Sequence, residues 1–186
     1  MLTKTLVSAT ALTLTASFAM ADAHAENPMV GGAEMLAEQN IIENAVNSPI
    51  HTTLVAAVQA AGLVETLSGP GPFTVFAPTD DAFDMISDAS LAALLDPSAK
   101  AQLTQILTCH VVGAEVFSDA IGGMIADSGG TQAVETLGGC VLTAQMDGDA
   151  ITLTDENGRV ATVTIADVDQ SNGVIHVIDR VMLPQQ

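Results

Sequence analysis

Basic residues are scarce in this sequence. Lys and Arg together number 4 of 186 residues, against 22 Asp and Glu, and the formal net charge is −18. Nucleic-acid-binding proteins owe most of their affinity to Lys and Arg that neutralise phosphates, so this balance argues against a nucleic-acid partner. It argues equally against docking on an anionic membrane surface. We favour solubility as the reason for the acidic excess, because a strongly charged surface resists aggregation. The alternative is that divalent cations bridge this surface to another acidic one.

A hydrophobic run of transmembrane length is also missing. The one long apolar stretch, residues 6–20, is interrupted by Thr and Ser and is short for a bilayer span, which needs about 20 residues. It follows Lys4 and ends at Ala19-Met20-Ala21, the small-x-small pattern that signal peptidase reads. We therefore predict a signal peptide at residues 1–21, cleaved before Asp22. The mature chain is then exported, periplasmic or extracellular, with no membrane insertion after cleavage.

Catalytic motifs are missing as well. The sequence has no Gly-x-Ser-x-Gly, no phosphate loop and no dinucleotide fingerprint. Ser, His and Asp are all present, but no spacing among them singles out a catalytic triad. The sequence therefore predicts a protein that is not an enzyme.

Metal-ligand spacings are not found around the four histidines, His24, His51, His110 and His176. No Cys-x-x-Cys or His-Glu-x-x-His accompanies them, so we predict no metal site. We expect His110 and His176 to be hydrogen-bonded structural residues.

Calcium is the one cofactor for which the sequence offers a weak candidate. The segment from Asp167 resembles the start of a calcium-binding loop, but Asn172 occupies the position that requires Gly and Ile178 the position that requires Glu. It therefore fails as an EF-hand. A looser calcium contact would use acidic residues that we otherwise expect to be solvated turn carboxylates: Asp147, Asp149, Asp155 and Glu156.

The sequence contains two cysteines, Cys109 and Cys140. An even number of cysteines in an exported protein favours a disulfide. Such a bridge would join the helical half to the sheet and stabilise the fold by roughly 3–4 kcal/mol. The alternatives are two buried free thiols or a reactive cysteine, although no basic residue lies close in sequence to lower a thiol pKa.

The order of sequence patterns predicts one α+β domain at residues 33–184, after a flexible tail at residues 22–32. The first half has helical spacing of apolar residues, with a break at Ser48-Pro49, where Ser48 is a candidate cap for the next helix. A buried strand is expected at Phe73–Ala77. Thr79 is expected to cap the helix that follows.

The second half consists of short β-branched runs separated by Gly, Asp and Asn. In one run, Val160, Thr162 and Thr164 alternate with apolar residues, which indicates a sheet with one wetter face. Helices first and strands later favour an α+β domain over a doubly wound one. The expected strands are Val111–Phe117, Ala133–Leu137, Val141–Met146, Ile151–Thr154, Val160–Ile165 and Val174–Val177.

Three segments, in this order, resemble the fasciclin (FAS1) domain family. Gly71–Phe83 (GPFTVFAPTDDAF) is similar to the first signature segment of that family, and Asn172–Pro184 (NGVIHVIDRVMLP) to the second. Between them, Leu107–Val112 (LTCHVV) stands where the family carries its Tyr-His motif, with Cys109 in place of the usual aromatic residue. The resemblance covers about Ile41 to Pro184.

The resemblance implies a compact β-wedge with a helical layer from the N-terminal half, and no catalytic activity. It implies a role in cell adhesion, matrix contact or surface interaction, with an envelope or extracellular protein or polysaccharide as partner. The alternative function is a periplasmic carrier of a small hydrophobic ligand. The motif residues, structural or binding, would be Thr74, Phe76, Ala77, Pro78, Thr79, Phe83, His110, Asn172, Gly173, His176 and Asp179.

Two roles are open for Asp179, which precedes Arg180 in the last signature segment. It could be an exposed recognition residue, or a buried hydrogen-bond acceptor that ties down the terminal strand. We favour the second role.

Overall fold

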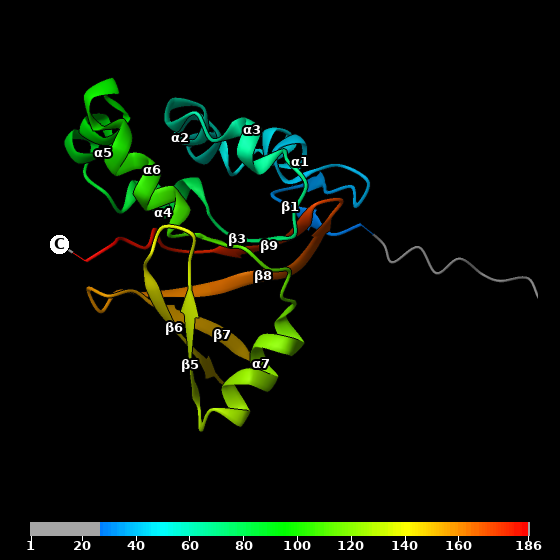
Figure 1. Ribbon diagram of the computed structural model, residues 1–186. Helices are drawn as coiled ribbons and strands as arrows, with labels where there is room; N and C mark the ends of the chain where they lie inside the picture. Colours follow the sequence, from blue (N-terminus) through cyan, green and yellow to red (C-terminus); the bar gives the residue numbers. More distant parts are fainter. Residues whose placement is uncertain (1–26, 186) are drawn as a thin grey trace, which may run out of the picture.

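The computed structural model describes residues 27–185, so the predicted signal peptide lies outside the described residues. The fold is α+β, as predicted: a strongly curved, nearly closed sheet with most of the helices layered on one side (Figure 1). No helix within residues 27–185 has the length and apolar character needed to cross a membrane.

Seven strands form the main sheet in the order β4-β3-β9-β8-β7-β6-β5. Neighbouring strands are antiparallel except β3 and β9, which are parallel. The strands are β3 (Phe73–Pro78), β4 (Val111–Val112), β5 (Thr131–Glu135), β6 (Val141–Asp147), β7 (Ala150–Thr154), β8 (Val160–Gln170) and β9 (Gly173–Ile178).

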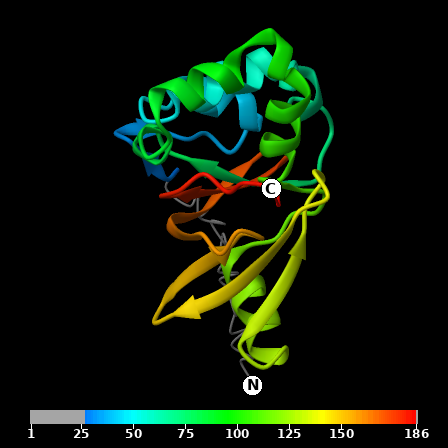
Figure 2. The ribbon, with the colours of Figure 1, turned by 90° about the vertical axis from the view of Figure 1, so that its left-hand side faces the viewer.

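Helices α1 to α6 form a layer over the β3–β9 pair, while α7 lies on the other side, beside β5, β6 and β7 (Figures 1 and 2). The helices are α1 (Ile41–Asn47), α2 (Thr52–Ala61), α3 (Val64–Leu67), α4 (Asp80–Asp84), α5 (Asp88–Leu95), α6 (Lys100–Thr108) and α7 (Ser118–Asp127), with a short 3-10 turn, η1 (Pro97–Ala99).

Strand β8 pairs with β7 on one side and with β9 on the other. Its register shifts twice, between Val163 and Ile165 and between Ile165 and Val168. Such bulges bend a strand and increase its twist. The C-terminal part of β8 can therefore pair with β9 while Val160–Thr162 pairs with β7.

The curvature creates two hydrophobic clusters instead of one. The larger cluster lies between the helical layer and the sheet and includes Leu54, Val58 and Leu107. The smaller cluster lies inside the wedge, where Ile121 and Ile125 of α7 pack with residues of β3, β6, β7 and β9. A hydrogen bond from the Leu137 N–H to the Val111 carbonyl, 2.8 Å long, brings the chain after β5 to β4 and nearly closes the sheet.

Helix α7 was not predicted from the sequence, and the strand expected at Val111–Phe117 is wrong beyond Val112. Gly122 and Gly123 give this segment a low helix propensity, which hides the helix in the sequence pattern. Its helical form is stabilised by tertiary packing, because Ile121 and Ile125 are four residues apart and both are buried.

The break at Ser48-Pro49 is present, but Ser48 does not cap the second helix. Ser48 follows α1 as its C-cap, and His51 occupies the N-cap position of α2. The Ser48 hydroxyl lies 2.7 Å from His51 Nδ1. The predicted cap at Thr79 is confirmed, since its hydroxyl accepts the Ala82 N–H at the start of α4.

The ordered fold begins earlier than the predicted boundary at residue 33. Strands β1 (Met29–Val30) and β2 (Ala33–Glu34) form a small antiparallel hairpin. Val30 is only 2% exposed and belongs to the larger hydrophobic cluster. The expectation of a flexible tail at residues 22–32 is therefore wrong for Met29–Val30, which form β1 of this hairpin.

Candidate interaction site

The two signature segments lie side by side in the sheet as β3 and β9. They pair in register from Phe73 with Gly173 to Pro78 with Ile178. Every residue of β9, and every residue of β3 after Phe73, is buried. Phe76, Ala77 and Pro78 are therefore core residues in the centre of the fold, as parallel strands covered on both faces require.

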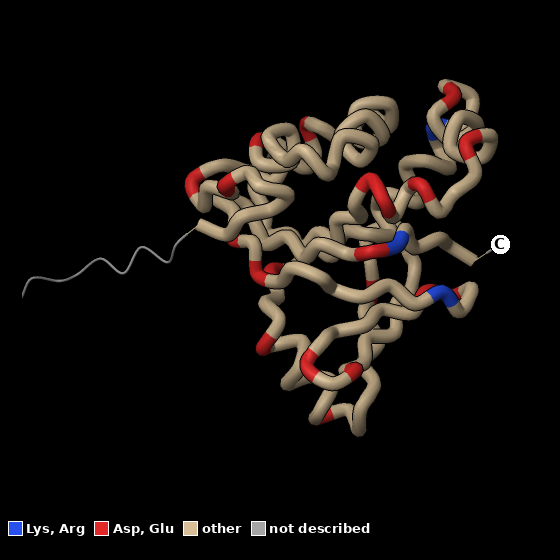
Figure 3. Tube along the Cα trace, turned by 180° about the vertical axis from the view of Figure 1, so that it is seen from behind, with Lys and Arg blue, Asp and Glu red and all other residues tan. Residues whose placement is uncertain are grey.

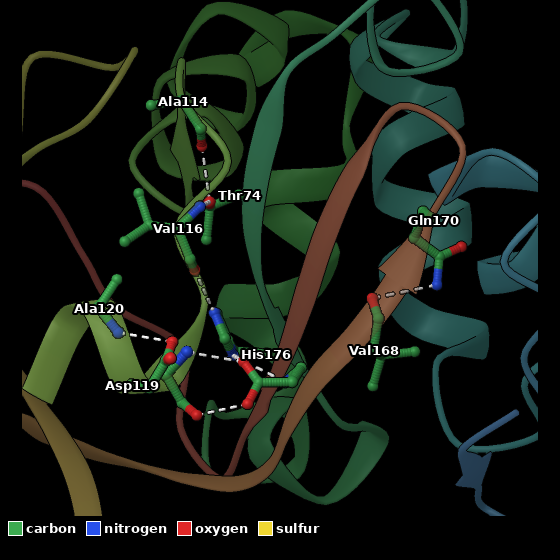
Figure 4. A network of polar contacts seen from close by, with 10 residues as sticks. Thr74, Ala114, Val116, Asp119, Ala120, Val168, Gln170 and His176 are labelled. Carbon is green, nitrogen blue, oxygen red and sulfur yellow. Dashed lines mark hydrogen bonds and ion pairs between the residues drawn. The ribbon is translucent and has the colours of Figure 1, made fainter. Parts of the chain in front are cut away.

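Thr74 fixes the loop that follows β4. Its hydroxyl donates a hydrogen bond to the Ala114 carbonyl at 2.6 Å and accepts one from the Val116 N–H at 2.9 Å (Figure 4). The side chain is 1% exposed. Thr74 thus holds a loop 40 residues further along the chain against the central strand.

His176 holds the other side of the same loop. Its Nε2 donates to the Val116 carbonyl at 2.9 Å (Figure 4). Its Nδ1 accepts the Asp167 N–H at 3.2 Å. The ring stacks on Phe76 with centroids 5.7 Å apart. Burial lowers the pKa of His176, against smaller upward effects of the Val116 carbonyl and the Asp167 charge. The imidazole is therefore neutral near pH 7, as a structural histidine should be.

His110 connects α6 to the C-terminal segment. Its Nδ1 donates to the Ile106 carbonyl at 2.8 Å, and its Nε2 accepts the Met182 N–H at 3.0 Å. Burial lowers the pKa of His110 to about 4, although the Ile106 carbonyl and the Asp155 charge act in the opposite direction. Both ring nitrogens are used by backbone groups, so neither is free to bind a ligand.

Asn172 joins three elements at the start of β9. Its carbonyl oxygen accepts the Ile41 N–H at 3.0 Å, at the N-terminus of α1. Its amide nitrogen donates to the carbonyls of Leu67, at 2.8 Å, and Gly69, at 2.9 Å. The side chain therefore satisfies backbone groups of the helical layer from the first residue of the second signature segment.

Gly173 permits the close approach of β9 to β3. Its φ angle is 151°, and a Cβ atom at this position would lie 2.0 Å from the Phe73 carbonyl oxygen. Only glycine fits there without movement of the β3 backbone.

The remaining two motif residues, Phe83 and Thr79, are also structural. Phe83, at 4% exposure, packs in the larger hydrophobic cluster. The Thr79 N–H donates to the Ile178 carbonyl at 3.2 Å.

Two acidic residues hold the C-terminal segment. Asp179 accepts the Thr162 N–H at 2.7 Å and is half-buried, which matches the acceptor role. The expectation that Asp155 is a solvated turn carboxylate is wrong, because it is 5% exposed. Its carboxylate accepts the backbone N–H groups of Asn157, Arg159 and Leu183.

A disulfide joins Cys109, at the end of α6, to Cys140, just before β6, with Cα atoms 5.3 Å apart. The bridge links the helical layer to the wedge, as predicted, and both residues are buried. Within residues 27–185, no group of three or more His, Cys, Asp or Glu side chains could hold a metal ion.

The motif residues thus form the framework of the fold, and a candidate binding surface must be sought elsewhere. One such surface is the outer face of β5 to β8. Thr154 of β7 lies between Thr143 of β6 and Val160 of β8. In the same way, Thr152 of β7 lies between Gln145 of β6 and Thr162 of β8. We call this surface the threonine face and define it as Thr131, Thr143, Gln145, Thr154, Val160 and Thr162. Thr152 has the same orientation but is buried, at 8% exposure.

The alternation of β8 had indicated part of the threonine face. The residues that alternate with the threonine face along β6, β7 and β8 point the other way. They belong to the smaller hydrophobic cluster: Leu142, Ala144, Leu153 and Ala161. The same alternation of Thr or Gln with apolar residues in 142–145 and 151–154 would have identified the parts in β6 and β7. What the sequence could not show is which strands are neighbours.

Comparison with known proteins agrees with the motifs. The family model described as "Fasciclin domain" matches residues 49–184. Protein sll1483 of Synechocystis sp. is 42% identical over 163 residues, which are 86% of this chain and 81% of that protein. The cell surface glycolipoprotein MPB83 of Mycobacterium bovis is 31% identical over 166 residues, which are 86% of this chain and 68% of that protein.

A solved structure supports the fold. It is the FAS1 domain pair from the insect cell adhesion molecule Fasciclin I, which superposes with a TM-score of 0.69. Sequence identity is 18%, over 78% of this chain and 51% of that one. The family match, the relatives and the fold agree: this chain belongs to the fasciclin domain family.

Proposed function

We propose that this protein is a non-enzymatic adhesion or surface-interaction module that binds an envelope or extracellular protein or polysaccharide. The observation that carries the proposal is the family match over residues 49–184. One relative is a cell surface glycolipoprotein, and the fold neighbour comes from a cell adhesion molecule. In this proposal the chain acts after export, in the periplasm or outside the cell.

We place the contact on the threonine face for two reasons. The motif side chains that could compete for this role are mostly buried or committed to backbone hydrogen bonds. The threonine face instead offers hydroxyl groups and one amide, which can donate and accept hydrogen bonds to sugar hydroxyls or to a peptide backbone.

Charge also favours this face. Of the strand residues that share its outward side, two are acidic, Glu135 at the end of β5 and Asp147 at the end of β6, in a chain whose net charge is −18. An anionic or neutral partner would meet less repulsion there than on the rest of the surface, and like charges at an interface are strongly unfavourable.

The test is surface attachment of producing cells with the gene intact, deleted and restored. The proposal expects deletion to lower attachment and the restored gene to recover it. Unchanged attachment after deletion would contradict it. A parallel measurement with a calcium chelator decides whether divalent cations bridge the acidic surface to its partner: a loss of attachment in the chelator would favour bridging.

The alternative function, a carrier of a small hydrophobic ligand, has one apolar pocket in its favour. It lies between α1, α2, α3 and β3, is lined by residues such as Leu54, Val58 and Phe76, and has a volume of about 180 Å³. Pockets for drug-sized ligands usually measure about 300–1,000 Å³. A lipid or pigment that copurifies with the protein would favour the carrier function.

A further inference from the structure

A second and larger pocket opens beside α4, α5, α6 and the segment after β9. Its volume is about 860 Å³, within the range of small-molecule sites. Its apolar lining includes Ile86, Leu94, Ile106, Val181 and Leu183. We call it the arginine pocket, because Arg159 and Arg180 also line it.

The charges around this pocket differ from those of the rest of the protein. Of the basic residues within the described part of the chain, Lys100, Arg159 and Arg180, two line the pocket, and no acidic residue does. Figure 3 shows the basic residues gathered on the side of the molecule where the C-terminus lies. In a chain with 22 Asp and Glu, this makes the pocket the site best suited to an anion.

Neither guanidinium group is neutralised by a residue in the described part of the chain. Among residues 27–185, no carboxylate lies within 4.0 Å of Arg159 or Arg180, and neither guanidinium donates a hydrogen bond to another described residue. The neighbouring Asp179 accepts the Thr162 N–H instead. Each arginine carries five N–H donors suited to a carboxylate or a phosphate.

Glu156, three residues before Arg159, is also committed to other groups. Its carboxylate accepts the N–H groups of Val141 and Gln185, each through one oxygen. The acidic neighbours therefore leave both guanidinium groups available.

The apolar part of the pocket is incompletely covered by protein. Helix α5 has no buried residue at all, although Leu91, Leu94 and Leu95 pack against the larger hydrophobic cluster. A hydrocarbon chain in the pocket would remove part of this apolar surface from water, which is favourable in proportion to the area covered.

We propose that the arginine pocket binds an amphiphile with one anionic head group and an apolar tail. Arg159 and Arg180 would bind the head group, and Ile86, Leu94 and Leu183 would contact the tail. A fatty acid and a monoalkyl phosphate share this chemistry. The inference does not depend on the adhesion proposal, because the pocket does not include the threonine face.

The experiment is calorimetric titration of the purified protein with dodecanoate, dodecyl phosphate and dodecanol, each below its aggregation limit. We expect saturable binding of one equivalent of at least one anionic compound, with dodecanol at least about tenfold weaker, since loss of one charge-assisted interaction is of that size. The stronger of the two anions identifies the head-group class. Failure of both to bind, or equal binding of dodecanol, would overturn the proposal.

Variants locate the site. The double variant Arg159→Gln with Arg180→Gln should weaken binding of the anion by at least about tenfold and leave dodecanol binding unchanged. Lys100→Gln is the matched control, because it removes a positive charge that does not line the pocket; it should leave the affinity within about twofold of the original. Ala93→Trp, which adds bulk at the pocket wall, should weaken every compound. Equal losses in Lys100→Gln and in the arginine variant would contradict a local site.

Discussion

The Nε2 atom of His110 accepts a hydrogen bond from the backbone N–H of Met182, 3.0 Å away and 72 residues further along the chain. This bond can form only while the imidazole is neutral. It connects the Leu107–Val112 segment to the end of the second signature segment. The protonation state of one buried ring is therefore coupled to the attachment of the C-terminal segment.

We predict that stability falls as the pH falls from about 6.5 to about 4. Burial lowers the pKa of His110 to about 4, and it lowers the pKa values of His51 and His176 as well. The unfolded chain binds more protons in this window, so the neutral rings stabilise the fold fully above pH 6.5 and progressively less below it. His110 alone accounts for about 3 kcal/mol.

Urea unfolding at several pH values measures this effect. In His110→Gln we expect a loss of about 2–4 kcal/mol at pH 7.5, because the Ile106 and Met182 groups lose a well-placed partner, together with a shallower dependence on pH below 6.5. Parallel pH profiles for the variant and the original protein would show that His110 does not titrate in this way.

Asn172→Ala should destabilise the fold by about 2–4 kcal/mol, because it removes three hydrogen bonds and leaves part-buried backbone groups unpaired. Asn47→Ala is the matched control. Asn47 is exposed, and its amide makes a single 3.3 Å hydrogen bond to Gln39, so its loss should cost less than about 0.5 kcal/mol. Similar midpoints of urea unfolding for the two variants would contradict the assigned role of Asn172.

Gly173→Ala should destabilise the fold by more than about 3 kcal/mol, since the new Cβ would lie 2.0 Å from the Phe73 carbonyl oxygen. Gly123→Ala should have the opposite effect on stability. Gly123 lies in α7 with no atom within 4 Å of an added Cβ, so alanine should raise stability by about 0.5–1 kcal/mol. Thermal unfolding of both variants tests the pair, and a tolerated Gly173→Ala would require a different path for β9.

Reduction of the disulfide should lower stability by about 3 kcal/mol, because the bridge closes a loop with a sequence separation of 31. The double variant Cys109→Ser with Cys140→Ser should behave like the reduced protein. Both sulfurs are buried, so reduction should proceed faster under mild urea than in buffer. Equal unfolding midpoints with and without reductant would contradict a stabilising bridge.

The sequence predicted the fold well where local patterns and motifs coincide. The break after α1, the Thr79 cap and the short strands separated by Gly, Asp and Asn were all readable from residue type and spacing. Helix α7 was not, because its two glycines contradict its conformation and only packing of Ile121 and Ile125 explains it. In α7, tertiary packing compensates for the low helix propensity of the two glycines.

The candidate sites were harder to predict than the fold. The polar character of β8 was visible in its alternation, but the threonine face depends on the register that places Thr143 opposite Thr154. The arginine pocket depends on Arg159 and Arg180 lining one cavity, although 20 residues separate them along the chain and they lie on different connections. No local pattern encodes either arrangement, since both arise from contacts between distant parts of the chain.

In our proposal, the threonine face mediates attachment. We would replace Thr143 by Lys and Thr154 by Glu, which adds bulk to the face, keeps the net charge and places opposite charges on paired positions. The matched control replaces Ala56 by Glu and Ala60 by Lys on the exposed side of α2, a favourable pair four residues apart.

The most direct measurement is attachment of deletion cells restored with each of these two genes, with thermal unfolding of both purified proteins as a check on folding. We predict that the Ala56→Glu, Ala60→Lys gene restores attachment fully, while the Thr143→Lys, Thr154→Glu gene leaves cells near the level of the deletion strain. Full restoration by the threonine-face variant, with a melting temperature close to the original, would contradict the claim.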